Sequence, residues 1–269
     1  MLLQPLPTFN NVVATGVATL KVPKYALTLN RILLRLGGTT FTKAMITDIK
    51  IKLGVRTVYN ITGPLLDAIN KYKGLYDDAA HLTIDFNERD ATTLPGKEIG
   101  GYDLSKLDDM TLEITITGAT APTLAATGFF TAPQDNDLIE KVLYFPTSTS
   151  VAGKFPINFN PMGALVKRVF FFYAGTDWGN GTNGNLNRLE VKKNGLVIHD
   201  ADCVDNRFIA KEYQKVPQSK LYVYDPMVDN NASGMLVTSD AVSLEFNTFL
   251  TAGDAIQCYV ELLDKPYNA

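Results

Sequence analysis

Few side chains in this sequence have the type and spacing that catalysis or metal binding requires. The 269 residues include two histidines, His81 and His199, and two cysteines, Cys203 and Cys258. Metal-dependent cupin domains need several histidines and a carboxylate at each site, so a two-fold cupin enzyme cannot be built from this set. Neither histidine stands in a recognisable relation to a serine or cysteine nucleophile. We expect His81 at the start of a strand and His199 at the end of one, as polar residues at sheet edges.

Carboxylates are the remaining side chains of a type that can catalyse a reaction or bind a metal ion. Asp200, Asp202 and Asp205 gather before one predicted helix, and Asp77 and Asp78 follow another. An acid pair hydrolyses glycosides only at a defined separation in space, which spacing in the chain does not provide. We interpret these residues as helix caps and solvated loop residues. A structural Ca²⁺ held by the 200–205 group is the weaker alternative.

Glycine-rich segments also fail the tests for known motifs. Residues 96–101 (GKEIGG) lack the Lys-Ser or Lys-Thr ending of a phosphate-binding loop, and no nucleophile elbow occurs. Residues 176–187 (TDWGNGTNGNLN) match neither a dinucleotide fingerprint nor a Ca²⁺ loop, and we expect a long surface loop there. The sequence therefore predicts no enzyme, with no catalytic, cofactor-binding or metal residue to assign.

Composition excludes further classes of protein. The net charge is −3, and the basic residues are scattered, so nothing supports binding to nucleic acid. Two cysteines in apolar surroundings predict buried free thiols and a reducing compartment, not a disulfide framework. The first charged residue is Lys21; the segment before it lacks the pattern of a signal peptide, and no apolar run is long enough to cross a membrane.

Alternation of polar and apolar residues dominates the chain and predicts strands that pack on one face. Residues 169–174 (VFFFYA) suit a strand buried on both faces. Turn residues separate these runs at short intervals, which is typical of sandwiches and barrels. The clearest alternating runs are residues 82–87, 112–117 and 244–246.

Two short helices are predicted. Residues 62–74 carry Pro64 in the first turn and Gly74 at the end, where glycine accepts a left-handed conformation. Residues 202–215 have Asp202 as the expected N-cap and an apolar stripe formed by Val204, Phe208 and Tyr213.

The two halves of the chain repeat one pattern. Residues 47–60 (TDIKIKLGVRTVYN) and 187–200 (NRLEVKKNGLVIHD) both predict a strand, a turn and a second strand, followed by a helix and another strand. Other matches keep the same order, at a separation along the chain that drifts slowly upward. A duplicated domain explains this order better than coincidence. The matched pairs are Tyr25 with Phe155, Arg31 with Arg168, Ile49 with Leu189, Ile69 with Ile209, Ile84 with Val223 and Leu112 with Cys258.

The predicted fold class is all-β, with two tandem antiparallel β-sandwiches that each have a short helix inserted between strands. Residues 146–154 (PTSTSVAGK) are small and polar and suit a linker. We therefore expect a first domain over residues 1–145 and a second over 146–269.

At this point the chain resembles a known family. Residues 31–74, followed by the strand HLTIDF at 81–86, resemble the first half of the corticovirus-type major capsid proteins of tailless icosahedral phages. The similarity lies in order, length and spacing over nearly the whole chain rather than in an invariant motif. The second half repeats that order, and the family is similar in having two jelly rolls in one chain.

This resemblance implies a structural protein and no catalysis. It implies a homotrimer whose six jelly rolls form a pseudo-hexagonal capsomer, in an icosahedral shell around an internal membrane and double-stranded DNA. The implied partners are copies of the chain, neighbouring capsomers, vertex and minor capsid proteins and the membrane surface. The implied location is the virion capsid, after synthesis and assembly in the host cytoplasm. A chain start without charge fits a shell that makes no direct contact with nucleic acid.

The alternative reading is a bilobed β-sandwich protein that binds or processes carbohydrate. It draws on the acidic cluster and on Trp178, whose ring could stack on a sugar. The absence of a visible signal peptide and the single tryptophan count against it.

Overall fold

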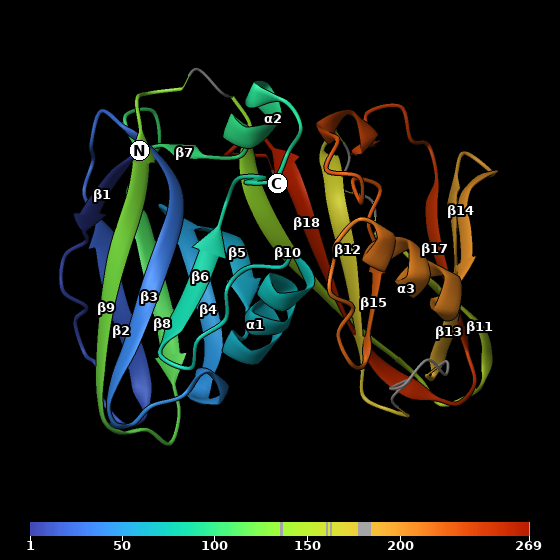
Figure 1. The fold of residues 1–269 in the computed structure, drawn as a ribbon, viewed down its shortest axis with the longest axis horizontal. Helices are drawn as coiled ribbons and strands as arrows, with labels where there is room; N and C mark the ends of the chain where they lie inside the picture. Colours follow the sequence, from blue (N-terminus) through green and yellow to red (C-terminus); the bar gives the residue numbers. More distant parts are fainter. Residues whose placement is uncertain (135–136, 160, 162, 177–183, 269) are drawn as a thin grey trace. The chain divides into compact units, whose positions relative to one another are not determined.

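A computed structural model describes residues 1–134, 137–159, 161, 163–176 and 184–268 (Figure 1). The chain divides into two compact units. Unit 1 comprises Met1–Lys71, Leu75–Leu143 and Leu263–Ala269, and unit 2 comprises Tyr72–Gly74 and Tyr144–Leu262. Each unit is a β-sandwich of two sheets, so the predicted all-β class is confirmed.

Unit 1 contains the first nine strands and the start of the tenth. One sheet has the order β1-β9-β3-β6, with β7 paired to β3, and the other has the order β2-β8-β4-β5. The first part of β10 pairs with β5 in parallel, at Val142 and Tyr59. The bounds are β1 (Leu2–Pro5), β2 (Gly16–Val22), β3 (Thr28–Thr40), β4 (Ile46–Leu53), β5 (Arg56–Ile61), β6 (His81–Asp85), β7 (Tyr102–Asp103), β8 (Met110–Ile116), β9 (Thr120–Thr131) and β10 (Ile139–Thr149).

Unit 2 repeats this arrangement. One sheet has the order β11-β17-β13-β14; the other runs β15-β12-β18 and continues to β10, with β16 paired to β12. The strands β10 and β18 each run from one unit into the other along the chain. The bounds are β11 (Gly153–Ile157), β12 (Leu165–Tyr173), β13 (Leu186–Lys193), β14 (Leu196–Asp202), β15 (Leu221–Tyr224), β16 (Leu236–Val237), β17 (Leu244–Leu250) and β18 (Asp254–Asp264).

The strand orders of the two units are the same. The order β2-β8-β4-β5 corresponds to β11-β17-β13-β14, and β1-β9-β3-β6 corresponds to β10-β18-β12-β15. Even the short strands agree, because β7 pairs with β3 and β16 pairs with β12. The sandwiches are therefore two copies of one topology.

The matched hairpins agree at every paired position. Ile49 pairs with Ile61 and Leu189 with Ala201, and the remaining Cα pairs of the first hairpin recur in the second at the same offset along the chain. Both hairpins have a register shift just before their last two pairs, at Ile51/Lys52 and at Val191/Lys192. A bulge inserts an unpaired residue and bends the strand, so a shared bulge position indicates a shared ancestral hairpin.

Five helical segments occur among the described residues. The predicted helices are confirmed as α1 (Gly63–Tyr72) and α3 (Cys203–Glu212), each between the fifth and sixth equivalent strands of its unit. Gly74 follows α1 with φ of +73°, as a left-handed helix end requires. The other three are α2 (Leu94–Glu98) and the 3₁₀ turns at Lys43–Met45 and Ala232–Gly234.

The apolar positions of the alternating strands form the cores. In unit 1, Ile49, Ile84 and Ile114 are fully buried, as the alternation predicts. In unit 2, β12 is buried on both faces, and Phe246 stacks on Phe159 at 4.4 Å between ring centroids. Burial of these side chains is the main force that holds each sandwich together.

Three expectations about whole strands are wrong. Residues 146–149 complete β10 instead of forming a linker, because this strand has paired neighbours that supply its backbone hydrogen bonds. The match of Leu112 with Cys258 joins β8 to β18, although β17 is the equivalent of β8; alternating strands resemble one another too closely for the match to be unique. The match of Tyr25 with Phe155 likewise joins the approach to β3 with β11, the equivalent of β2.

Candidate functional site

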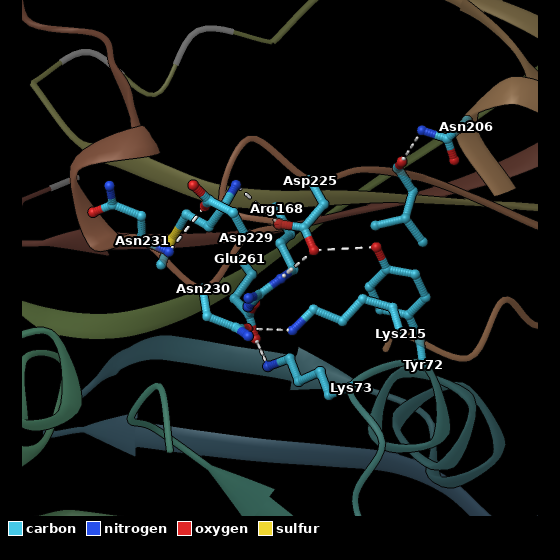
Figure 2. Close-up of polar contacts among 12 residues, drawn as sticks. Tyr72, Lys73, Arg168, Asn206, Lys215, Asp225, Asp229, Asn230, Asn231 and Glu261 are labelled. Atoms are coloured by element: carbon cyan, nitrogen blue, oxygen red, sulfur yellow. Dashed lines mark hydrogen bonds and ion pairs between the residues drawn. The ribbon is translucent and has the colours of Figure 1, made fainter. Parts of the chain in front are cut away.

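A buried network of charges lies in unit 2 (Figure 2). The Arg168 side chain, on β12, is fully buried; its Nε lies 3.0 Å from Asp225 Oδ2 and its Nη1 lies 3.0 Å from Glu261 Oε2. Lys73 forms a second ion pair with Glu261. The Tyr72 hydroxyl donates to Asp225 over 3.1 Å. Charge-assisted bonds of this kind offset the cost of removing the ions from water.

Burial raises the pKa of the Tyr72 hydroxyl well above its usual value, and the charge of Asp225 raises it further. Tyr72 is therefore a permanent hydrogen-bond donor to Asp225 at neutral pH. A neutral donor, two cations and two anions that satisfy one another form a structural arrangement, not an acid–base pair ready to exchange protons.

Unit 1 contains the counterpart of the central ion pair. Arg31 on β3 lies opposite Asp85 on β6, with 2.5 Å between Arg31 Nη2 and Asp85 Oδ2. In unit 2 the register that pairs Val169 with Tyr224 places Arg168 opposite Asp225. The sequence match of Arg31 with Arg168 thus reflects a repeated cross-strand pair. The Arg31 side chain retains 22% of its exposure, whereas Arg168 retains none.

A second repeated contact fixes each helix to its sandwich. Asn70 of α1 donates to the Thr83 carbonyl over 2.8 Å, and Asn206 of α3 donates to the Val223 carbonyl over 3.0 Å. Thr83 and Val223 lie on the equivalent strands β6 and β15, so the sequence match of Ile84 with Val223 finds the right strands but is out of register. The two asparagines come from different turns of their helices, so sequence matching misses this contact.

The predicted acidic groups are occupied by cations of the chain. Lys43 and Lys71 both bind Asp67 and Asp77. The hydrogen bond from Lys43 contributes most to lowering the pKa of Asp77, to about 2. Asp78 accepts the backbone N–H of Ala80 over 2.6 Å, and its contact with His81 is 3.3 Å.

The carboxylates of Asp200, Asp202 and Asp205 do not come together in one site. Asp200 forms a two-point ion pair with Arg188, at 2.7 and 2.6 Å. Asp202 takes the expected N-cap position of α3 but makes no side-chain cap bond, and Asp205 lies in the first turn, where a negative charge favours the helix. Among the described residues, no group of three or more His, Cys, Asp or Glu is arranged to hold a metal ion.

The two histidines belong to different units. His81 starts β6, as expected. His199 lies within β14, not at its end, and its Nε2 is 3.2 Å from the Tyr222 hydroxyl. Burial lowers the pKa of His199, so the ring is neutral at neutral pH. Cys203 and Cys258 are buried free thiols, as predicted, and burial raises the pKa of Cys203 to about 12. The predicted sugar contact, Trp178, lies outside the described residues.

Two neighbouring elements of unit 2, α3 and β14, have many exposed apolar side chains. The stripe predicted on α3 does not face the core: Phe208 retains 64% of its exposure, and the helix instead buries Cys203 and Ala210. The neighbouring strand β14 begins with three exposed apolar residues, of which Leu196 retains 70%. Exposed apolar groups of this density mark contact surfaces. The exposed apolar residues of β14, of α3 and directly after α3 are Leu196, Val197, Ile198, Val204, Phe208, Ile209 and Tyr213.

The corresponding elements of unit 1 bury their apolar side chains more completely. In α1, Leu66 and Ile69 are buried, and on β5 Val58 and Tyr59 are at most 3% exposed. The exposed apolar side chains of unit 2 therefore distinguish two otherwise equivalent hairpin–helix segments.

No helix of the described residues has the length and apolar character to cross a bilayer.

Comparisons with known proteins agree with this architecture. The family profile described as viral coat protein P2 N-terminal domain matches residues 3–131, and that of the C-terminal domain matches residues 139–266. The major capsid protein P2 from bacteriophage PM2 superposes with a TM-score of 0.87 at 18% identity, covering 98% of this chain and 97% of that one. A search of curated protein sequences gave no match.

More distant structures share the fold. The STIV MCP superposes with a TM-score of 0.72 at 15% identity, over 98% of this chain and 97% of that chain. The PBCV-1 virus capsid structure superposes with a TM-score of 0.64 at 11% identity, over 96% and 92%. Two sandwiches of one strand order, each with its helix after the fifth strand, form the double jelly-roll fold that these capsid proteins share. The chain belongs to the viral coat protein P2 family.

Proposed function

We propose that this coat protein is the major capsid protein of an icosahedral shell and that it assembles as a homotrimer. The observation that carries the proposal is the repeat of one strand order in both units. Three chains with two similar wedges each supply six wedges, and a closed three-fold ring then approximates six-fold packing. We assign residues 1–145 to the first jelly roll and 146–269 to the second, a division that falls within β10.

The shell we propose surrounds an internal membrane and double-stranded DNA. Support comes from the net charge of −3 and from the basic residues, which are scattered along the chain and form no cluster. A shell protein in direct contact with the genome needs cations that release counterions from the phosphates. Lipid between shell and DNA removes that requirement.

The proposed role is structural, with no reaction to catalyse. Its partners are other copies of the chain, neighbouring capsomers, vertex and minor capsid proteins and the membrane surface. The buried ion pairs of unit 2 support a scaffold role, because groups held by several partners are poorly placed to act on a substrate. The protein is located in the virion capsid after synthesis and assembly in the host cytoplasm.

Mass in solution tests the proposal. Light scattering of the purified chain should give three times 29.5 kDa, and electron microscopy should show six-lobed particles with three-fold symmetry. A stable monomer that binds oligosaccharides would contradict the proposal and favour the carbohydrate-binding alternative.

A further inference from the structure

The two equivalent strands β5 and β14 differ in what pairs with their outer edges. In unit 1, the sheet order β2-β8-β4-β5 continues to β10, which pairs in parallel with β5 at Val142 and Tyr59. In unit 2, the order β11-β17-β13-β14 stops at β14 among the described strands. The hairpin register places His199 at the position of Tyr59. The unit 1 copy thus shows which kind of strand this edge accepts.

The exposure of apolar side chains also differs between β5, whose outer edge is paired, and β14. On β5, Val58 and Tyr59 are 2% and 3% exposed, whereas Ile198, the equivalent of Val58, is 38% exposed. Val197 is 44% exposed; its equivalent on β5, Thr57, is also exposed but is polar. An edge strand with unpaired backbone groups and apolar side chains is a ready acceptor for an added strand, and natural proteins usually block such edges with charge, proline or a cover.

The strand that pairs with β5 also has an equivalent. In its second part, β10 follows β18 in the unit 2 sheet, and this is the place that β1 takes beside β9 in unit 1. β1 ends its sheet, carries no charge, and exposes Leu2 and Leu3 by 49% and 56%. Equivalent positions lie 140 residues apart in the hairpins and 137 apart at Arg31 and Arg168, so the position equivalent to Val142 falls within β1, between Leu2 and Pro5.

We propose that β1 of a second copy of this chain adds in parallel to the outer edge of β14, with a residue of Leu2–Pro5 opposite His199. This contact rests on the proposed trimer and specifies its strand-to-strand interface. It repeats between chains the pairing that β10 makes with β5 within a chain. Each copy offers one β14 edge and one β1 strand, so three copies close a ring with every such edge paired. The same contact also buries the apolar side chains of both strands away from water.

Cysteine cross-linking tests the contact. A chain with Leu2→Cys and Ile198→Cys, treated with a short bis-maleimide, should give covalent dimers and trimers on a denaturing gel. The native Cys203 and Cys258 are buried and do not compete. Each single variant is one control, and Leu2→Cys with Val17→Cys is the matched control, because Val17 is 40% exposed on β2, a strand of the other unit 1 sheet.

Each outcome of the cross-linking experiment either supports or overturns the proposed contact between β1 and β14. Cross-linked trimers in the double variant, at least tenfold above the matched control, support the contact. A trimer by light scattering without this product overturns the strand contact and leaves the capsomer intact. Cross-linking within one chain also overturns it. A monomeric protein overturns both proposals.

Charge placed in the contact provides an independent measurement. Leu3→Asp and Val197→Asp should each raise the trimer dissociation constant at least tenfold, because an unpaired carboxylate in an apolar contact is costly. The control is Val242→Asp, at a residue 93% exposed outside both strands. Circular dichroism should be used to check that each variant is folded. Equal affinities for all three variants would refute the contact.

Discussion

Replacing Arg168 with alanine tests whether the buried network stabilises unit 2. The change removes a fully buried guanidinium that Asp225 and Glu261 share, and both carboxylates are at most 4% exposed. Breaking a buried pair from one side costs ~3–5 kcal/mol, because the remaining charge stays buried. Glu261 keeps Lys73 and Asp225 keeps the Tyr72 hydroxyl, so we expect the lower end of that range.

The matched control is Arg31→Ala in unit 1. Arg31 makes the equivalent pair with Asp85, whose side chain is only 7% exposed, but the Arg31 side chain is 22% exposed. Removing it should open Asp85 to water, so the loss should be smaller, about 1 kcal/mol. Urea unfolding followed by circular dichroism measures both losses. With a denaturant slope of about 2 kcal/mol/M, the midpoints should fall by ~1.5 M and ~0.5 M respectively. Hydrogen exchange in β12 and β15 peptides should locate the larger loss in unit 2.

A double-mutant cycle of Arg168→Ala with Asp225→Ala isolates the pair itself, and we expect a coupling of ~1–3 kcal/mol. The reasoning is refuted if Arg168→Ala costs no more than Arg31→Ala, or if the coupling is zero. Either result would mean that the network only offsets its own desolvation.

Three further predictions concern titration and thiol chemistry. Burial lowers the pKa of His199, so the unfolded chain binds the proton more tightly than the folded chain does. The stability that this group contributes should be complete above about pH 6.5 and should fall as the pH drops through the folded pKa. The variant His199→Gln should therefore show a smaller change in the free energy of unfolding between about pH 7 and pH 5. The pKa of Asp77 is lowered to about 2, chiefly by Lys43; its contribution should be present above about pH 4 and lost toward pH 2, and Asp77→Asn should reduce that acid dependence. Burial raises the pKa of the Cys203 and Cys258 thiols, so a disulfide reagent at about pH 8 should find neither in the folded protein and both in urea.

Sequence patterns predict much of this fold because burial repeats along the chain at fixed periods. Alternation located β6, β8 and β17, and Pro64 and Gly74 located the bounds of α1 closely. The repeat of the hairpins is visible because turn chemistry and strand alternation agree there. The match of Leu112 to Cys258 failed for the opposite reason: without a turn signal, one alternating strand resembles another.

The network and the contact surface could not be predicted in the same way. Arg168, Asp225 and Glu261 come from separate segments of the chain, and only the pairing of strands brings them together. The stripe of Val204, Phe208 and Tyr213 has the pattern of a core-facing helix, yet it faces outward. A pattern records that side chains avoid water, and it does not record whether the same chain or another one covers them.

The repeated hairpin has an evolutionary consequence. Because translation joins both copies in one polypeptide, the two kinds of wedge are always made in equal number, and neither can be lost without the other. The copy at 187–200 lies in surroundings different from those of the copy at 47–60, so selection can act on each separately. A comparison of tolerated substitutions at equivalent positions of the two copies would therefore measure, within a single gene, how surroundings alone reshape the constraints on one ancestral hairpin.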